Sequence, residues 1–184
     1  MGNLDRDIRV TLADGRALVV RDAGKRDARG VAEMLDAVAS EPRATLVLRP
    51  GEAAPSDWRR RIAEALRAPR GLFLVADAAG VIVGNLGLWP DANPASAHVA
   101  WIGMSVAAGW RGVGAGGALL EAAMGWAAAR DFRRGVLGVF PDNAPAIAFY
   151  ERHGFVREGL RLQQYRRGDR YHDEVLMARP LTDL

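Results

Sequence analysis

The chain has 184 residues, which suits one globular domain and leaves little room for two. Apolar residues make up 49% and charged residues 26%, a balance that excludes a disordered chain. The absence of cysteine excludes disulfides, thiolate metal ligands and a cysteine nucleophile. The formal net charge is only +3, so the composition predicts no nucleic-acid partner.

Neither the start of the chain nor its apolar stretches resemble a targeting or membrane segment. Residues 1–7 lack the basic and then apolar build of a signal peptide. Residues 71–90 and 112–129 are apolar, but Asp77 and Glu121 interrupt them and alanine and glycine dilute them. We therefore expect a soluble, cytoplasmic protein with no membrane partner.

The first pattern along the chain is that of a β-hairpin. Residues 8–12 and 16–20 are strand-like and flank Asp14-Gly15, a dipeptide suited to a tight turn with positive φ. We expect this hairpin to form an N-terminal extension, residues 1–22, within a single domain that spans residues 1–184.

Two helices are predicted next. Asp27 is placed to cap the first helix, and Ser56 is placed to cap the second, which Pro69 and Gly71 end. A loop punctuated by prolines separates the two helices. Apolar residues recur at helical spacing in both of them: Val31, Met34, Leu35 and Val38 in the first, and Trp58, Ile62, Ala65 and Leu66 in the second.

The remainder of the chain interleaves strands with helices, which predicts an α/β (α+β) fold with a mixed sheet and helices on both faces. A polar loop, residues 90–97, separates the second hairpin from the next strand. The strands are expected at residues 72–76, 81–89, 98–106, 136–140, 155–165 and 170–179, and the helices at residues 114–130 and 143–153.

The segment between the strand 98–106 and the following helix is rich in glycine. It runs Trp110-Arg111-Gly112-Val113-Gly114-Ala115-Gly116-Gly117. Glycine permits a tight turn and keeps Cβ atoms away from a ligand, while main-chain N–H groups at a helix start attract anions. The turn therefore predicts a binding site for a phosphate or pyrophosphate, with Arg111 adding a positive charge.

Two families use a turn of this kind. Gly112-x-Gly114-x-x-Gly117 matches the dinucleotide-binding fingerprint, and Asp142 could stand for its ribose-binding acid. Such a domain needs several further βα units, however, and only 67 residues follow Gly117, the last of which are strand-like. An oxidoreductase that binds a nicotinamide cofactor is therefore the more distant alternative.

The other match is Arg111-x-x-Gly114-x-Gly116, in which the chain resembles the GNAT superfamily of N-acetyltransferases. About thirty residues further on, residues 143–155 resemble the second signature of that family, with Asn143 before a short helix and Tyr150 before a Gly-Phe turn. The resemblance covers residues 72–180. It implies a mostly antiparallel sheet of six to eight strands, in which the fourth and fifth core strands, residues 98–106 and 136–140, splay apart.

In that family acetyl-CoA lies in the gap between the splayed strands, so the resemblance implies a set of cofactor contacts. The strand before the turn would contact the pantetheine arm through its main chain, and the turn would hold the pyrophosphate. Asn143 would bind the pantetheine arm, although the same residue can serve only as a helix cap. The implied cofactor-binding residues are Met104, Ser105, Val106, Arg111, Gly112, Val113, Gly114, Ala115, Gly116, Asn143 and Ala146.

Two residues are candidates for proton transfer. Tyr150 would protonate the departing thiolate by resemblance, whereas by its spacing alone it could be a core aromatic residue. His98 stands where many family members carry a glutamate, and a histidine suits a general base near neutral pH, although a water or an already deprotonated amine could replace it. No metal-ligand spacing appears among the histidines, so no metal is expected.

The sequence thus predicts an N-acetyltransferase that moves an acetyl group from acetyl-CoA directly to a primary amine. By resemblance, the acceptor is expected to be a small molecule such as an amino acid. A protein N-terminal or lysine acetyltransferase and a non-catalytic acyl-CoA-binding module stay open as alternatives. Trp58, Trp89 and Trp101 are candidates for the acceptor pocket or for the core, and an exposed final strand would allow a homodimer.

Overall fold

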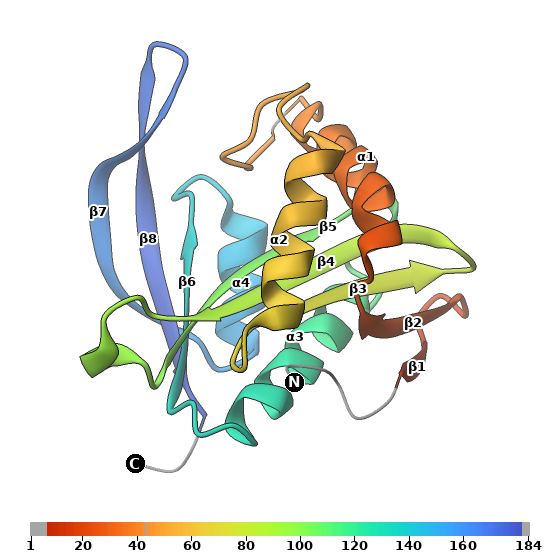
Figure 1. Cartoon of the computed structure of the whole chain (residues 1–184). Helices are drawn as coiled ribbons and strands as arrows, with labels where there is room; N and C mark the ends of the chain where they lie inside the picture. Colours follow the sequence, from red (N-terminus) through yellow and green to blue (C-terminus); the bar gives the residue numbers. More distant parts are fainter. Residues whose placement is uncertain (1–6, 43, 182–184) are drawn as a thin grey trace.

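The structure, a computed structural model, describes residues 7–42 and 44–181 and contains one eight-stranded sheet (Figure 1). The strands follow the order β1-β2-β3-β4-β5-β6-β8-β7. Their bounds are β1 Ile8–Thr11, β2 Ala17–Asp22, β3 Leu72–Ala78, β4 Val81–Pro90, β5 Val99–Val106, β6 Arg134–Val139, β7 Val156–Arg167 and β8 Arg170–Pro180. All neighbouring pairs are antiparallel except β5 with β6, which confirms the mostly antiparallel sheet.

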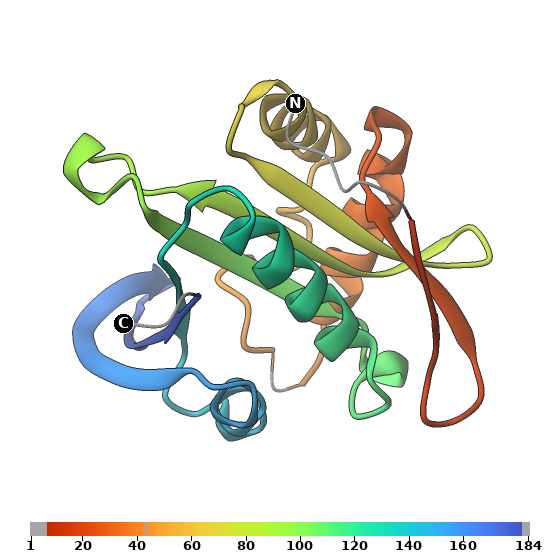
Figure 2. The same cartoon turned by 90° about the horizontal axis from the view of Figure 1, so that it is seen from below.

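Helices cover both faces of this sheet, as predicted (Figures 1 and 2). The α-helices are α1 Ala28–Ala39, α2 Pro55–Arg67, α3 Ala115–Ala128 and α4 Ala144–Arg152, and short 3₁₀ segments lie at Lys25–Asp27, Pro94–Ser96 and Ala108–Trp110. Helices α1 and α2 pack on one face, whereas α3 and α4 pack on the other. None of these helices is long and apolar enough to cross a membrane.

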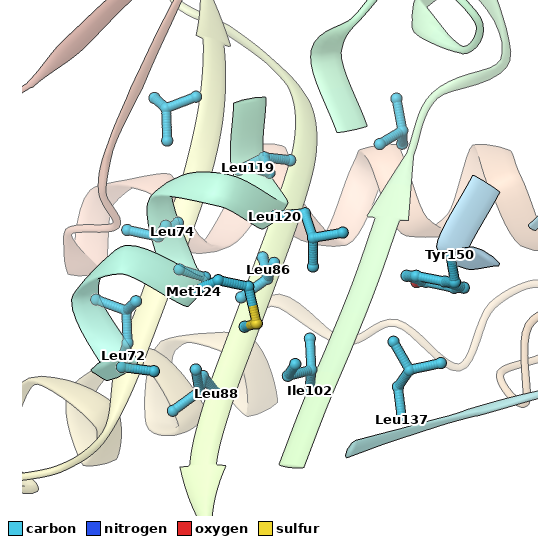
Figure 3. Close-up of a cluster of buried hydrophobic side chains, with 14 of the residues drawn as sticks. Leu72, Leu74, Leu86, Leu88, Ile102, Leu119, Leu120, Met124, Leu137 and Tyr150 are labelled. Carbon is cyan, nitrogen blue, oxygen red and sulfur yellow. The ribbon is translucent and has the colours of Figure 1, made fainter. Parts of the chain in front are cut away.

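Strand β3 begins with a continuous apolar run, residues 72–76, because both of its faces are buried there. On β3, Leu72 and Leu74 belong to the cluster around α3, whereas Phe73 and Val75 belong to the cluster around α1 and α2. Figure 3 shows the first of these clusters, in which leucines of β3 and β4 meet Leu119, Leu120 and Met124 of α3. This alternation separates the two faces of the sheet.

The pairing of β5 with β6 is short, and this feature positions the site. The two strands pair in parallel only from Val99 to Trp101 on β5 and from Arg134 to Val136 on β6. Beyond these residues β5 stays paired with β4, and β6 stays paired with β8. The adjoining edges of β5 and β6 therefore diverge, which confirms the predicted splay and gives a V-shaped opening.

Of the two predicted helix caps, that of Ser56 is wrong, and that of Asp27 is confirmed in position but not in its side-chain hydrogen bond. Ser56 lies inside α2, because Pro55 already occupies the first turn and Ala54 is the N-cap. Asp27 stands at the N-cap of α1, but its side chain makes no cap hydrogen bond there. Its carboxylate instead accepts two N–H bonds from Arg21, both at 2.8 Å, and one from the main chain of Gly24 at 2.7 Å.

The Asp27 carboxylate therefore joins β2 to the start of α1. Burial pushes the pKa of Asp27 up, but the hydrogen bonds from Arg21 and Gly24 outweigh burial and hold this pKa below its ordinary value. The same guanidinium contacts Asp77 on β3 at 2.8 Å. The hairpin, the helix and the sheet are thus fastened at one arginine.

The predicted exposed final strand is also wrong, because β8 lies between β6 and β7 and the edge belongs to β7. This edge strand carries exposed apolar side chains at Val156, Leu160 and Leu162. The homodimer therefore stays a prediction, with β7 in place of the final strand as its candidate surface.

Candidate active site

The glycine-rich turn lies at the open end of the V, between β5 and α3. Gly112 has φ +75° and Gly114 has φ +109°, values that a residue with a side chain rarely adopts. No atom lies within 4 Å of the Cβ position of Gly112. The first bonded N–H of this helix is that of Ala118, which donates to the Gly114 carbonyl at 3.0 Å. Among the described residues, the N–H groups from Gly112 to Gly117 find no acceptor, so this turn can receive an anion.

The N-terminal hairpin braces this turn, which the sequence did not indicate. The main-chain N–H of Ala13 donates to the carbonyl of Val113 at 3.0 Å. Arg16 lies 3.8 Å from the ring centroid of Trp110 and donates to the carbonyl of Gly109 at 2.7 Å. The hairpin of β1 and β2 therefore supports the predicted pyrophosphate turn from the outside.

Arg111 is held at the turn, but its charge is already paired. Its Nε donates to the carbonyl of Val106 at 2.7 Å, and its two terminal nitrogens donate to the two carboxylate oxygens of Glu41, each at 2.7 Å. A pyrophosphate bound to this guanidinium would have to compete with Glu41. The sequence could not reveal Glu41, because 70 residues separate it from Arg111.

The main chain of β5 presents alternate residues to the V. The N–H of Ala107, just beyond β5, donates to the carbonyl of Val83 on β4 at 2.9 Å. Since neighbouring residues of a paired strand direct their main chain to opposite sides, Ser105 faces β4, whereas Met104 and Val106 face the opening. Of the three predicted contacts on β5, this places two in the V and leaves Ser105 outside it.

Asn143 is the N-cap of α4 and lies beside the same opening. Its Oδ1 accepts the N–H of Ala146 at 3.3 Å, and its Nδ2 donates to the hydroxyl of Thr45 at 2.8 Å. The structure thus shows the capping role of Asn143. A contact with the pantetheine arm stays a prediction, and it would have to replace the hydrogen bond to Thr45.

Tyr150 lies on α4, on the α3 face of the sheet and beside the V. Its side chain is only 7% exposed and belongs to the same buried cluster as Ile102 of β5 and Leu137 of β6 (Figure 3). The rings of Phe149 and Phe155 lie 5.2 Å and 5.6 Å from its ring. Burial raises the pKa of the Tyr150 hydroxyl above its ordinary value, so the group stays protonated at neutral pH. A protonated hydroxyl at this place can act as an acid.

His98 is not brought together with Tyr150. It is exposed and lies in the turn before β5, adjacent to Val99, where β5 and β6 are still paired. The glycine-rich turn follows the other end of β5, eight residues away along the strand. The expectation of a base at His98 is therefore not supported by its position at the closed end of the V.

Polar side chains gather on the other face of the V, which α1 and α2 cover. Glu174 of β8 is only 4% exposed, and it accepts hydrogen bonds from the Tyr165 hydroxyl at 2.6 Å and from Arg161 at 3.2 Å. Burial and the hydrogen bond to Glu174 raise the pKa of Tyr165 to about 12. Glu174 follows Asp173 and precedes the apolar run Val175-Leu176-Met177, so the sequence carried no signal that singled out this cluster.

The three candidate tryptophans have different roles. Trp58 and Trp89 pack edge-on against Phe73, with ring centroids 6.0 Å and 6.4 Å away, and belong to the core under α1 and α2. Trp101 instead borders the V, and its Nε1 donates to Asp91 at 2.7 Å. Residues 7–42 and 44–181 contain no group of three or more His, Asp or Glu side chains that could hold a metal ion.

Comparisons with known proteins identify the family. The model of the Acetyltransferase (GNAT) family matches residues 33–155. L-amino acid N-acetyltransferase AaaT from Escherichia coli K12 is 36% identical over 131 residues, which cover 68% of this chain and 77% of that protein.

Solved structures agree in fold. An acetyltransferase of the GNAT family from Streptococcus pneumoniae aligns with a TM-score of 0.80 at 24% identity, over 90% of this chain and 99% of that chain. A phosphinothricin acetyltransferase from Sinorhizobium meliloti in complex with acetyl-CoA aligns with a TM-score of 0.78 at 21% identity, over 93% of this chain and 89% of that chain. The family model covers more than half of the 184 residues, so the chain belongs to the GNAT family and is an N-acetyltransferase with acetyl-CoA as its acetyl donor.

Proposed function

We propose that the enzyme transfers the acetyl group of acetyl-CoA directly to the primary amine of a small molecule, with a free amino acid as the leading acceptor. One observation carries this proposal. The V between β5 and β6 has unpaired main chain and a glycine-rich turn on its α3 side, and a cluster of charged side chains on its α1–α2 side. Donor and acceptor can therefore approach one opening from opposite faces.

The donor side fits coenzyme A without rearrangement of the main chain. The N–H groups from Gly112 to Gly117 would hold the pyrophosphate, since they lie at a helix start and four of these six residues are glycines, which have no Cβ atom. The main-chain groups of Met104 and Val106 that face the opening would form hydrogen bonds with the amides of the pantetheine arm, in the way that an added strand would. Arg111 would exchange Glu41 for phosphate, and Asn143 would exchange Thr45 for the arm.

Tyr150 supplies the proton for the leaving group in this proposal. The amine nitrogen forms a bond to the acetyl carbon while the carbon–sulfur bond breaks, and the Tyr150 hydroxyl gives its proton to the departing sulfur. An ammonium acceptor loses two protons in total, one replacing the proton of Tyr150 and one passing to solvent. Because His98 lies at the closed end of the V, the proposal assigns the first deprotonation to water. The chain has no cysteine, so no acyl-cysteine intermediate intervenes.

The shape of the acceptor side favours a small molecule over a polypeptide. The connection between α1 and α2, residues 40–54, touches the β7–β8 hairpin, since Arg167 donates to the carbonyl of Ala44 at 3.1 Å. Beside this contact lies a cavity of about 350 Å³ lined by Val47, Arg49, Glu52, Arg166, Arg167 and Gly168. A peptide groove would need this bridge to open. The activity named for the Escherichia coli relative supports the same acceptor class, and we retain the cytoplasm as the expected location.

A panel of amines tests the proposal through thiol release from acetyl-CoA. The panel contains the twenty L-amino acids, short peptides with free N-termini and peptides with internal lysines. Turnover with free amino acids, at higher kcat/KM than with the peptides, is the expected result. Turnover with peptides alone would replace the proposal by protein acetylation, and tight binding of coenzyme A without turnover of any amine would replace it by a binding module.

A further inference from the structure

The carboxylate of Glu174 lies directly over the β6 side of the V. A Cβ atom built on Gly138 would come within 1.8 Å of Glu174 Oε1, so only glycine leaves room for this carboxylate. Gly138 itself is exposed, and it lies two residues beyond Val136, the last residue of β6 that pairs with β5. Glu174 is therefore a buried anion whose neighbour on β6 faces open space.

The β5 side of the same face is also open, and a cation borders it. Gly103 is exposed, and no atom lies within 4 Å of its Cβ position. The guanidinium of Arg161, which extends from β7, lies 5.3 Å from the ring centroid of Trp101 on β5. Glycines at positions 103 and 138 thus leave a space on the two diverging strands, with Glu174 on one side and Arg161 beside Trp101.

An irregularity in the β7–β8 hairpin creates this arrangement. Arg161 pairs with Glu174 and Tyr165 pairs with His172, so three residues of β7 stand opposite the single residue Asp173. Gln163 in this bulge has φ +52°, and its N–H donates to Asp173 at 2.7 Å. In a regular hairpin Tyr165 would lie two positions further from Glu174. Bulges that direct side chains in this way are common beside active sites.

The Arg161 guanidinium has hydrogen-bond donors that the cluster does not occupy. Arg161 makes one hydrogen bond to Glu174, and no other acceptor for its guanidinium occurs among the described residues. Its side chain is 40% exposed, whereas that of Glu174 is 5% exposed. A guanidinium offers five N–H donors, so most of them stay available to a ligand. Because the Arg161 side of this ion pair is partly exposed, solvent screens the pair and its contribution to stability is small.

We propose that Glu174 and Arg161 recognise the acceptor as an α-amino acid zwitterion. The carboxylate of Glu174 accepts hydrogen bonds from the ammonium group, and the guanidinium of Arg161 donates to the α-carboxylate. This inference rests on the proposed acetylation of free amino acids and names the residues that recognise the two charged groups of the acceptor. Trp101 supports Arg161 by stacking, and Tyr165 orients Glu174 through its hydroxyl.

The test compares an amino acid with its carboxamide, which keeps the amine but has lost the negative charge. The pair is built from the free amino acid with the highest kcat/KM in the panel. In Arg161→Met we expect the KM of the free amino acid to rise by about 10- to 100-fold, since a charge-assisted bond is lost, and the KM of the carboxamide to change less than about twofold. Glu174→Gln should raise KM for both substrates, because both carry the ammonium group.

Matched variants separate recognition from a structural role. Arg157→Met removes another β7 arginine, which pairs with Glu151 at 3.0 Å outside the cluster, and should leave both KM values unchanged. Arg161→Lys keeps the charge and should give an intermediate KM for the free amino acid, which provides a second readout if Arg161→Met does not fold. The affinity for coenzyme A, measured by calorimetry, should be the same in all of these variants.

Equal changes of KM for the acid and the carboxamide in both Arg161 variants would overturn the inference. In that case the wild-type enzyme would still acetylate free amino acids, and the proposed function would stand. Failure of the wild-type enzyme to acetylate any free amino acid would instead overturn the proposed function itself, so the two failures are distinguishable.

Discussion

The two sides of the V are built in different ways. The donor side comes from two continuous segments, residues 104–116 and 143–150, and it offers mainly main-chain groups and glycines with positive φ. The proposed acceptor side comes from residues on four strands, with the side chains of Trp101 on β5, Arg161 on β7 and Glu174 on β8 next to Gly138 on β6. Recognition by the main chain requires special backbone angles, which leave a local sequence pattern, whereas recognition by side chains requires only that distant residues meet.

One segment touches both sides. The α1–α2 connection, residues 40–54, pairs Glu41 with Arg111 and Thr45 with Asn143 on the donor side. The same connection offers the carbonyl of Ala44 to Arg167 on the acceptor side. The two halves of the site are therefore joined through this loop. We expect variants of one half to leave ligand binding at the other half measurable.

Gly114→Val should have the largest effect, on the donor side alone. A β-branched residue is strained at φ +109°, and its side chain would meet Leu12 of the hairpin that braces the turn, so the turn could not keep its conformation. We expect binding of coenzyme A to be lost, by at least about 100-fold in Kd, as measured by calorimetry. Gly125→Ala is the control, because Gly125 lies in the same helix with no atom within 4 Å of its Cβ position. Unchanged affinity in Gly114→Val would remove the turn from the donor site.

Tyr150→Phe should separate chemistry from donor binding. The variant removes the proposed acid but keeps the buried ring, so kcat should fall by roughly 100-fold while the Kd of coenzyme A stays within about twofold. Steady-state kinetics and calorimetry measure the two quantities. A parallel loss of affinity and of thermal stability would mean that the hydroxyl has only a packing role.

Glu41→Gln should strengthen the donor side modestly. The variant frees the Arg111 guanidinium from a carboxylate that lies 2.7 Å away. Because Glu41 and Arg111 are partly exposed, the competition is weak, and we expect the affinity for coenzyme A to rise about two- to fivefold at low ionic strength. Glu33→Gln on α1, where Glu33 pairs with Arg29 at 3.6 Å, is the matched control. A weaker affinity in Glu41→Gln would show that Glu41 positions Arg111 instead of competing for it.

The smallest expected effect concerns the free energy of unfolding at alkaline pH, to which one tyrosine from each side of the V contributes. The folded state raises the pKa of Tyr150 through burial, and it raises that of Tyr165 to about 12 through burial and Glu174. Both tyrosines ionise near pH 10 in the unfolded chain, so their contribution to stability is complete below pH 10 and is lost as the pH rises above it. Urea unfolding between pH 9 and 11 measures this loss.

For buried Tyr150 the expected loss is about 1.4 kcal/mol for each pH unit above 10. Tyr150→Phe and Tyr165→Phe should each flatten the pH dependence over this range, because both hydroxyls stay protonated in the folded state while the unfolded chain ionises. A variant that leaves the pH dependence unchanged would show that its tyrosine ionises as readily in the folded protein as in the unfolded chain.

The elements whose signals are local were predicted well. The hairpin at Asp14-Gly15, the long helix after Gly114 and the short helix after Asn143 all form where the spacing of apolar residues and turn residues indicated. The errors arose where a local signal competed with a distant partner. Asp27 could have capped α1, but Arg21 lies close enough in space to take its carboxylate.

The role of His98 as a base stays a prediction, and the structure shows why the sequence could not place this residue relative to the opening. Its spacing from Arg111 matched a family position, but spacing along a strand does not say where the neighbouring strand diverges. That divergence begins after Trp101, which leaves His98 on the paired side. The order of β7 and β8 could not be predicted either, because both orders satisfy the same alternation of side chains.

By itself, the sequence determined the family and the class of fold, and it indicated the proposed donor half of the site. These depend on glycine angles, helix starts and apolar periods, each set by residues within a few positions of one another. Only the tertiary structure decided which carboxylates meet Arg111 and Arg161, and which face of the V each of them borders. The physical reason is that a charged side chain is indifferent to how far along the chain its partner lies and responds only to distance in space and to burial.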